Sequence, residues 1–119
     1  MMYLFVCYLV CSTCKKAEAV LQEQGILYEK RDIKLQNPTA EELREWISRS
    51  GLPIKKFFNT SGLVYQELQL KDKLPQMSEE EMIALLVTNG MLVKRPLLVH
   101  QKQVLVGFRE EQYRSLQES

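Results

Sequence analysis

Two cysteines separated by two residues, Cys11 and Cys14, are the side chains best suited to chemistry in this sequence. Two thiols at this spacing can close a small disulfide. The residues that follow them are rich in Lys, Ala and Glu and predict a helix, so both thiols would lie at its start. Free N–H groups and the helix dipole at that position favour the thiolate, the reactive form of cysteine. The motif therefore predicts thiol–disulfide redox chemistry.

The strand before the motif is predicted from an uncharged apolar run at residues 3–10. Both faces of this run are apolar, which is typical of a central strand covered by helices on both sides. We interpret Cys7, inside the run, as a core residue. The run is too short to span a bilayer as a helix, and no basic segment or cleavage pattern flanks it. We therefore expect no membrane segment and no secretion signal.

Length and composition narrow the class of protein. A chain of 119 residues is long enough for one domain with a substantial core. Its 16 Lys and Arg nearly balance its 15 Asp and Glu, so no overall field favours direct binding of nucleic acid or a membrane surface. Three cysteines, an odd number at low density, predict free or cycling thiols. Such thiols need a reducing compartment, and we expect a cytoplasmic protein.

The two ends of the chain carry the signals of an α/β protein. Apolar residues at helical spacing predict a helix at 12–25, and a second strand is expected at 26–33. Near the C-terminus, residues 97–99 and 104–106 read as an antiparallel hairpin, followed by a short helix at 109–116. The chain thus begins with a βαβ unit and ends with two strands and a helix.

Between these ends, the sequence predicts only helices. Capping boxes at Thr39-x-x-Glu42 and Ser78-x-x-Glu81 begin two of them. Shorter helical segments are expected after Pro53 and around residues 64–68. The order predicts a thioredoxin-like α/β sandwich with a mixed four-stranded sheet, in one domain at 1–119 with a helical insertion at about 38–90.

Four segments of the sequence resemble the ArsC/Spx family of thioredoxin-fold proteins, and the resemblance covers nearly the whole chain. It is most similar to the arsenate reductase-like branch of that family. The family includes glutaredoxin-dependent arsenate reductases and redox-sensing regulators of the Spx type that bind RNA polymerase. The segments are Cys11–Ala17, Gly51–Thr60, Lys94–Leu97 and Val106–Glu111.

The resemblance implies roles for three residues. Cys11 matches the cysteine that attacks the substrate, and Cys14 matches the second thiol of the Spx-type motif, which would resolve the adduct as a disulfide. Arg95 matches an arginine that holds the oxyanion and stabilises the thiolate, because a guanidinium fork suits both charges. The resemblance also implies that the bond from Arg95 to Pro96 is cis.

The resemblance implies substrate contacts for Ser12, Thr13, Asn59 and Arg95. At Asn59 the family has an arginine, and its third arginine falls at Gly107, where Arg109 is a displaced substitute. The first-strand histidine of the family is replaced by Cys7. Since one guanidinium holds an oxyanion more weakly than three, we expect weak arsenate binding.

Three functions remain open at this point. The first is an arsenate reductase-like thiol oxidoreductase with no bound cofactor, reduced by glutathione, glutaredoxin or thioredoxin. The second is a non-enzymatic redox switch of the Spx type that binds the RNA polymerase α subunit. The third is a binding module that keeps the fold without the chemistry.

Metal sites are less well supported by the sequence. The spacing Cys7-x-x-x-Cys11-x-x-Cys14 matches the cluster motif of radical S-adenosylmethionine enzymes, but Cys7 would have to leave a central strand to ligate iron. A zinc site would have only His100 beside these cysteines. We therefore expect no metal.

Overall fold

A computed structural model describes residues 2–116 of the chain. Four strands form one mixed sheet in the order β2-β1-β3-β4. β1 pairs in parallel with β2, whereas β3 is antiparallel to both β1 and β4. The predicted α/β class and the mixed four-stranded sheet are confirmed. The strands are β1 (Tyr3–Cys7), β2 (Tyr28–Asp32), β3 (Leu97–Val99) and β4 (Val104–Val106).

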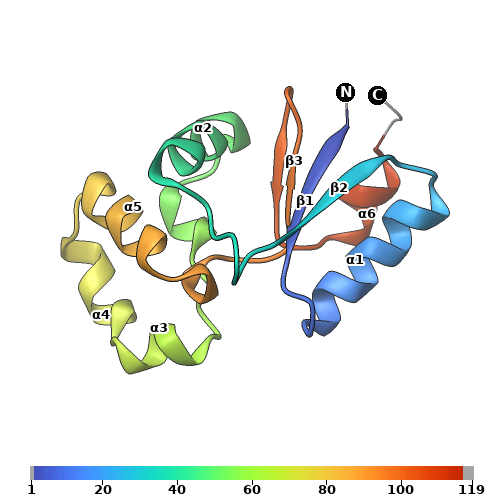
Figure 1. Ribbon diagram of the computed structural model, residues 1–119. Helices are drawn as coiled ribbons and strands as arrows, with labels where there is room; N and C mark the ends of the chain where they lie inside the picture. The colour runs from blue at the N-terminus through green and yellow to red at the C-terminus, as the bar shows by residue number, and fades with distance from the viewer. Residues whose placement is uncertain (1, 117–119) are drawn as a thin grey trace.

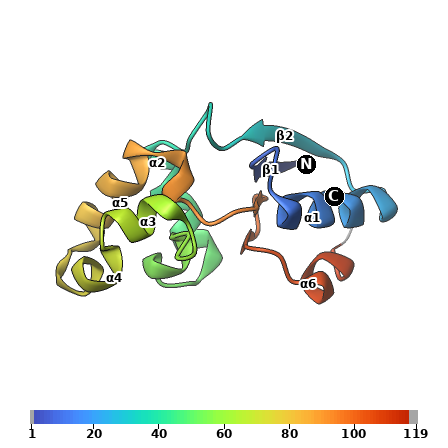
Figure 2. The same cartoon turned by 90° about the horizontal axis from the view of Figure 1, so that it is seen from below.

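The helices lie in two groups on either side of the sheet (Figures 1 and 2). One group is α1 (Ser12–Glu23) and α6 (Glu110–Arg114), which contact each other. The other is the helical segment between β2 and β3, whose first helix contacts β4. Its elements are α2 (Ala40–Ser50), η1 (Ile54–Phe57), α3 (Leu63–Glu67), α4 (Leu70–Lys73), η2 (Leu74–Gln76), α5 (Glu79–Thr88) and η3 (Gly90–Leu92).

The pleat of β1 divides its side chains between these two groups. Phe5 and Cys7 pack with α1 and α6 in one apolar cluster, whereas Val6 belongs to the other, larger cluster around the helical segment. This follows from the alternation of side chains along a strand. Cys7 therefore faces the helix that carries the other two cysteines.

The capping boxes predicted in the middle segment are present in the structure. Thr39 and Ser78 each form a complete capping box, at the start of α2 and α5. Gly51 ends α2 in the left-handed region at φ 70°. The two short elements α4 and η2 were not predicted, because their sequence carries neither a capping box nor a sustained apolar stripe.

Two connections fix the middle segment against the sheet. The Arg31 guanidinium at the end of β2 binds the Glu42 carboxylate of α2 with two hydrogen bonds of 2.7 and 2.8 Å. On the return path, Phe58 forms an isolated antiparallel bridge with Val93, and the Lys94 N–H donates to the Phe57 carbonyl at 2.7 Å. The chain that enters β3 is thus held by backbone contacts.

The first strand is shorter than the sequence predicted. It ends at Cys7, and both Leu9 and Val10 are exposed rather than buried. The reason is local hydrogen bonding, because the Tyr8 N–H donates to the Cys14 sulfur and its carbonyl accepts from Cys11. The backbone N–H and carbonyl of Tyr8 therefore form hydrogen bonds with residues of the motif and not with a neighbouring strand. Among residues 2–116, no helix combines the length and apolar character needed to cross a bilayer.

Candidate thiol site

The sheet topology brings distant parts of the sequence to one edge. β3 runs antiparallel to β1, and β4 runs antiparallel to β3, so the end of β1 lies beside the start of β3 and the end of β4. Cys11 follows β1, Arg95 precedes β3 and Gly107 follows β4. Cys11, Arg95 and Gly107 therefore follow or precede strand ends at the same edge of the sheet, the lower one in Figure 1.

Cys11 is the N-cap residue of α1 and is half-buried. Its extended backbone, with φ −84° and ψ 123°, ends the turn after β1, and its carbonyl accepts the first helical hydrogen bond from Lys15. The N–H groups of the first helical turn have no carbonyl to bind inside the helix. No acidic side chain lies in that turn, and Lys15 and Lys16 are exposed just beyond it. Cys11 therefore stands at the positive end of the α1 dipole.

Cys14 lies one turn further into the helix, with only 3% of its surface exposed. Its side chain interacts with both Cys7 and Cys11. The hydrogen bond with Cys7, together with burial, raises the pKa of the Cys14 thiol far above its ordinary value. The same contact lowers the pKa of Cys7, which is 1% exposed. Cys14 is thus a protonated thiol between an accessible and a buried partner.

Arg95 forms a cis peptide bond with Pro96, as the sequence resemblance implied. Its guanidinium carbon lies 5.0 Å from the centre of the Tyr8 ring, a cation–π contact, and its Nη1 donates to the Met91 carbonyl at 3.4 Å. The side chain therefore points towards the loop that leads into Cys11 and not away from it.

Tyr8 contacts all of these groups, although the sequence analysis assigned it only to the predicted strand. Its ring lies under the Arg95 guanidinium, its N–H donates to the Cys14 sulfur at 3.4 Å, and its carbonyl accepts from the Cys11 N–H at 3.0 Å. An aromatic residue three positions before Cys11 was the only available signal. The stacking partner is distant in sequence and could not be identified from it.

The other residues predicted to contact the substrate differ in their exposure and position. Ser12 and Thr13 are exposed in the first turn of α1, next to Cys11. Asn59 is buried, and its side-chain oxygen accepts from Ser61 within the same turn. Gly107 has φ +76° and offers no side chain, whereas Arg109 is exposed two residues later. The roles given to these residues stay predictions.

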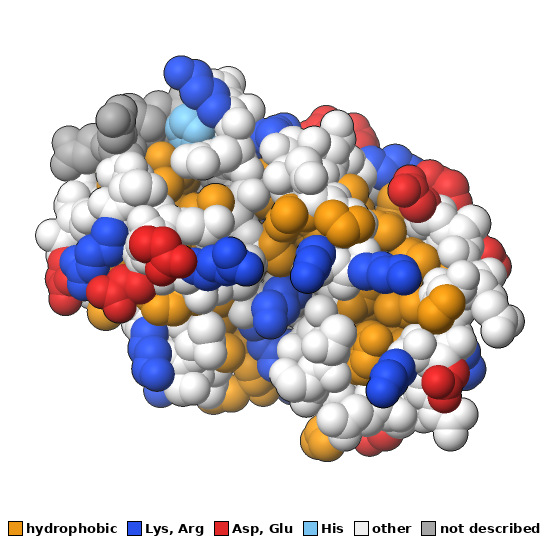
Figure 3. Space-filling model, turned by 180° about the vertical axis from the view of Figure 1, so that it is seen from behind, with side chains coloured by type: hydrophobic (Ala, Val, Ile, Leu, Met, Phe, Trp, Pro, Cys, Tyr) orange, Lys and Arg blue, Asp and Glu red, His pale blue; other side chains and the backbone are white. Residues whose placement is uncertain are grey.

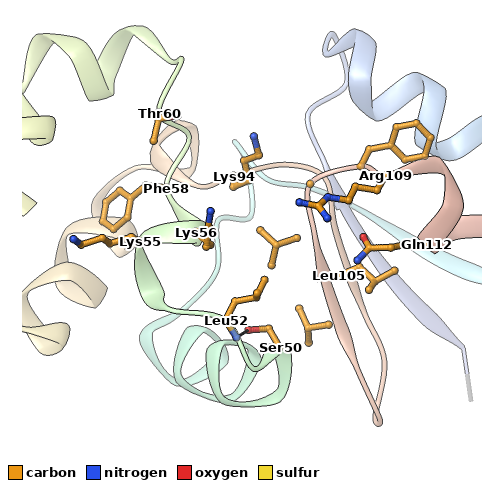
Figure 4. Close-up of a pocket in the computed structure, with 14 residues that line it drawn as sticks. Ser50, Leu52, Lys55, Lys56, Phe58, Thr60, Lys94, Leu105, Arg109 and Gln112 are labelled. Atoms are coloured by element: carbon orange, nitrogen blue, oxygen red, sulfur yellow. Dashed lines mark hydrogen bonds between the residues drawn. The ribbon is translucent and has the colours of Figure 1, made fainter.

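A cavity of about 490 Å³ lies between the middle segment and the β4 side of the sheet (Figure 4). Lys55 and Lys56 of η1, Lys94 before β3 and Arg109 after β4 all line it. We call these four side chains the basic rim. Leu52, Phe58, Val104, Leu105, Val106 and Phe108 supply apolar walls. In Figure 4, Arg109 and Lys94 approach the opening from opposite sides.

No metal centre is evident among the described residues. Residues 2–116 contain no group of three or more His, Cys, Asp and Glu side chains placed to hold a metal ion. The three cysteines are free thiols.

Comparison with known proteins agrees with this geometry. The family described as the ArsC family matches residues 8–116. The chain is 49% identical over 109 residues to the uncharacterized protein YusI of Bacillus subtilis, covering 92% of each. It is 30% identical over 105 residues to the global transcriptional regulator Spx of Staphylococcus haemolyticus, covering 87% of this chain and 78% of the regulator. A crystal structure of an ArsC family-related protein from Bacteroides fragilis superposes with a TM-score of 0.93 at 60% identity, covering 95% of each chain.

Proposed function

Because this chain belongs to the ArsC family, we propose that it is an arsenate reductase-like thiol oxidoreductase with Cys11 as the nucleophile. One observation carries the proposal. An accessible cysteine begins α1, while a second cysteine lies buried one turn behind it and contacts it. A nucleophilic thiol with a protonated resolving thiol behind it is the arrangement that thiol–disulfide exchange requires.

The reaction follows from the positions of the two sulfurs. The Cys11 thiolate attacks an oxidised sulfur of the substrate, the substrate bond breaks, and its leaving thiolate takes a proton from solvent. Cys14 then loses its proton and attacks the Cys11 sulfur, which releases the reduced substrate and leaves a Cys11–Cys14 disulfide. The substrate gains two electrons in these steps, and two thiols of an external reductant restore the dithiol.

We assign the reductant by its chemistry. Glutathione, or a glutaredoxin or thioredoxin that is itself reduced by another system, supplies the two thiols. In this proposal the protein binds no cofactor. A cytoplasmic location follows from the same requirement, because that compartment keeps thiols reduced. Arsenate is a poor candidate substrate, since Arg95 alone matches the family's oxyanion arginines and Gly107 and Asn59 supply no charge.

A redox switch is the second candidate. The similarity to an Spx regulator and the two-cysteine motif favour it. In this function, closing the Cys11–Cys14 disulfide would alter a surface that binds the RNA polymerase α subunit. No turnover is required.

Two assays separate these functions. In the first, a small disulfide is reduced by the protein with glutathione, and glutathione disulfide is followed by NADPH consumption through glutathione reductase. We expect Cys11→Ser to abolish turnover and Cys14→Ser to accumulate a mixed disulfide at Cys11. The matched control Cys7→Ala, which also removes one thiol, should retain capture of the substrate.

The second assay measures binding of purified polymerase α subunit to the reduced and oxidised protein. Oxidation-dependent binding without turnover would favour the switch. Turnover that persists in Cys11→Ser would exclude the oxidoreductase mechanism, and oxidation-dependent binding that persists in Cys11→Ser would exclude the switch, because each depends on this sulfur.

A further inference from the structure

The cavity beside β4 is lined by basic side chains and by no acidic ones. Four of its 14 lining residues are Lys or Arg, and none is Asp or Glu. The ion pairs within residues 2–116 use five other cations and leave the basic rim unneutralised: Lys30, Arg31, Arg44, Arg49 and Arg114. The protein as a whole has a net charge of only +1, so this concentration is local. Figure 3 shows Lys and Arg side chains gathered where the sheet meets the helical half.

Backbone hydrogen bonds hold two of the segments that line this cavity. Lys94 is held by its backbone bond to Phe57, and the Gly107 N–H donates to the Pro96 carbonyl at 2.9 Å. A side chain at Gly107 would approach Lys94 Cε to 3.2 Å, so the glycine leaves room for the lysine stem. The backbone at Lys94 and at Gly107 is therefore held in place by hydrogen bonds. A cluster of cations above an apolar floor is suited to an anionic partner with apolar parts.

The distance from the thiol indicates the size of that partner. Cys11 follows β1, whereas the cavity flanks β4, two strands away in the sheet. Neighbouring strands are separated by about 4.8 Å, so β4 lies roughly 10 Å across the sheet from β1. A single oxyanion bound at Cys11 cannot span this distance. An extended peptide covers it with about three residues.

The surface beside Cys11 also suits a peptide. Leu9 is 52% exposed and Val10 is 71% exposed, directly before the nucleophile. Exposed apolar residues next to a reactive group are common where another chain docks. The surface therefore offers apolar contact beside the Cys11 thiol and positive charge at the basic rim.

We propose that the basic rim is a docking subsite for an acidic segment of a peptide or protein substrate, whose reactive disulfide lies at least about three residues away, at Cys11. This inference rests on the proposed thiol oxidoreductase function and names its substrate class. The Cys11 thiolate attacks the substrate disulfide, one S–S bond breaks as another forms, and the released thiolate is protonated by solvent. The acidic side chains stay in the cavity and are not changed.

The first test measures docking without chemistry. A fluorescent peptide with two Glu residues and no cysteine is titrated into the Cys11→Ser protein, and its anisotropy is recorded. We expect saturable, salt-sensitive binding that weakens about tenfold when Lys56→Gln and Arg109→Gln are combined. The matched control is Lys73→Gln with Lys102→Gln, which removes the same charge from exposed positions outside the cavity. Circular dichroism verifies that both double variants are folded.

The second test measures the reaction. Cysteine peptides carrying two Glu or two Gln residues three positions away are activated as mixed disulfides with thionitrobenzoate. We expect the wild-type protein to release thionitrobenzoate about tenfold faster from the Glu peptide, and the ratio to fall towards one in the Lys56, Arg109 double variant. Hydroxyethyl disulfide, which is small and neutral, should react equally with the wild-type protein and with the single variant Lys56→Gln.

The outcomes distinguish the two proposals. Equal rates for Glu and Gln peptides, or equal docking in the rim variant and its control, would overturn the docking subsite. Inorganic phosphate or glutathione displacing the Glu peptide at equal concentration would overturn it too, in favour of a small-anion site. If hydroxyethyl disulfide and both activated peptides fail to react with the wild-type protein, the oxidoreductase function fails. Anisotropy in Cys11→Ser would still report whether the rim binds acidic peptides.

Discussion

Arg95 lies over the ring of Tyr8, with its guanidinium carbon 5.0 Å from the ring centre. The backbone of that same tyrosine contacts Cys11 and Cys14. A cation from the last third of the chain is thereby connected through one residue to the thiols of the first helix. This relationship gives the first prediction.

Replacing Tyr8 by Leu should weaken the placement of Arg95 and leave the backbone contacts to the cysteines in place. A cation–π contact at such a site contributes about 0.5–1 kcal/mol, so exchange with an anionic disulfide should slow roughly two- to fivefold. Stopped-flow absorbance with Ellman's reagent measures this rate. Hydroxyethyl disulfide should be affected less, and equal slowing of both reagents would show that the ring acts on the fold and not on Arg95.

The exposure of the three thiols predicts their order of alkylation. Cys11 is half-buried, whereas Cys7 and Cys14 are 1% and 3% exposed. A short pulse of iodoacetamide on the reduced, native protein should therefore give one adduct, at Cys11, and full labelling only after denaturation. Tandem mass spectrometry of chymotryptic peptides locates the adduct, because cleavage after Tyr8 separates Cys7 from the motif. Labelling of Cys14 at the same rate would contradict the observed burial.

The contact between Cys7 and Cys14 predicts a shift in titration. Hydrogen bonding with Cys7 is the largest cause that raises the pKa of Cys14, followed by burial. The variant Cys7→Ala should therefore lower the pKa of Cys14, while burial keeps it above that of a free cysteine. Carbon-13 NMR of the labelled cysteine Cβ atoms follows this titration in a Cys11→Ser background. An unchanged or higher pKa of Cys14 would show that Cys7 does not control it.

The Arg31–Glu42 pair predicts a pH-dependent contribution to stability. Hydrogen bonding with Arg31 lowers the pKa of Glu42, and its burial opposes this only in part. Since the folded pKa lies below the unfolded value of about 4.3, the contribution is present above that pH and is lost as the pH falls further. Glu42→Gln should cost about 1–2 kcal/mol at pH 7, including its capping contact with Thr39.

Urea denaturation at pH 7 and pH 3 measures the change. The cost of Glu42→Gln should shrink at the lower pH, because the wild-type carboxylate is then becoming protonated. Glu80→Gln is a suitable control, since Glu80 pairs with Arg44 on the exposed surface. A cost that is independent of pH would assign the effect to lost packing and not to the ion pair.

Two glycines in the middle segment should differ in their tolerance of a side chain. A Cβ at Gly90 would overlap the Ile33 carbonyl oxygen, which is backbone and cannot move aside. A Cβ at Gly51 meets nothing within 4 Å, and only its φ of +70° opposes the change. Gly90→Ala should cost about 3 kcal/mol or more, and Gly51→Ala about 1 kcal/mol. Thermal unfolding compares them, and similar losses would contradict the close approach at Gly90.

Much of the fold could be predicted because its signals are local. The capping boxes at Thr39 and Ser78 each began a helix, and the hairpin strands at 97–99 and 104–106 have the predicted bounds. Ile54, Phe57 and Phe58, which are spaced three and four residues apart after Pro53, are all buried. These features depend on residues a few positions apart, which a sequence displays directly.

What could not be predicted depends on long-range geometry. The apolar run suggested a strand up to Val10, but the Cys14 sulfur takes the Tyr8 N–H and ends the strand earlier. Cys7 was expected to fill the core, and it does, yet its contact with Cys14 follows from the pleat of β1. The basic rim joins two residues of η1 with one residue before β3 and one after β4, and the sheet order brings these segments together.

The pairing of Val6 with Leu97 joins two strands that are separated in sequence by the entire middle segment. Contacts between residues so far apart in sequence carry a high loop-closure entropy and slow folding. The edge that brings Cys11 and Arg95 together therefore depends on the least local contacts of the fold.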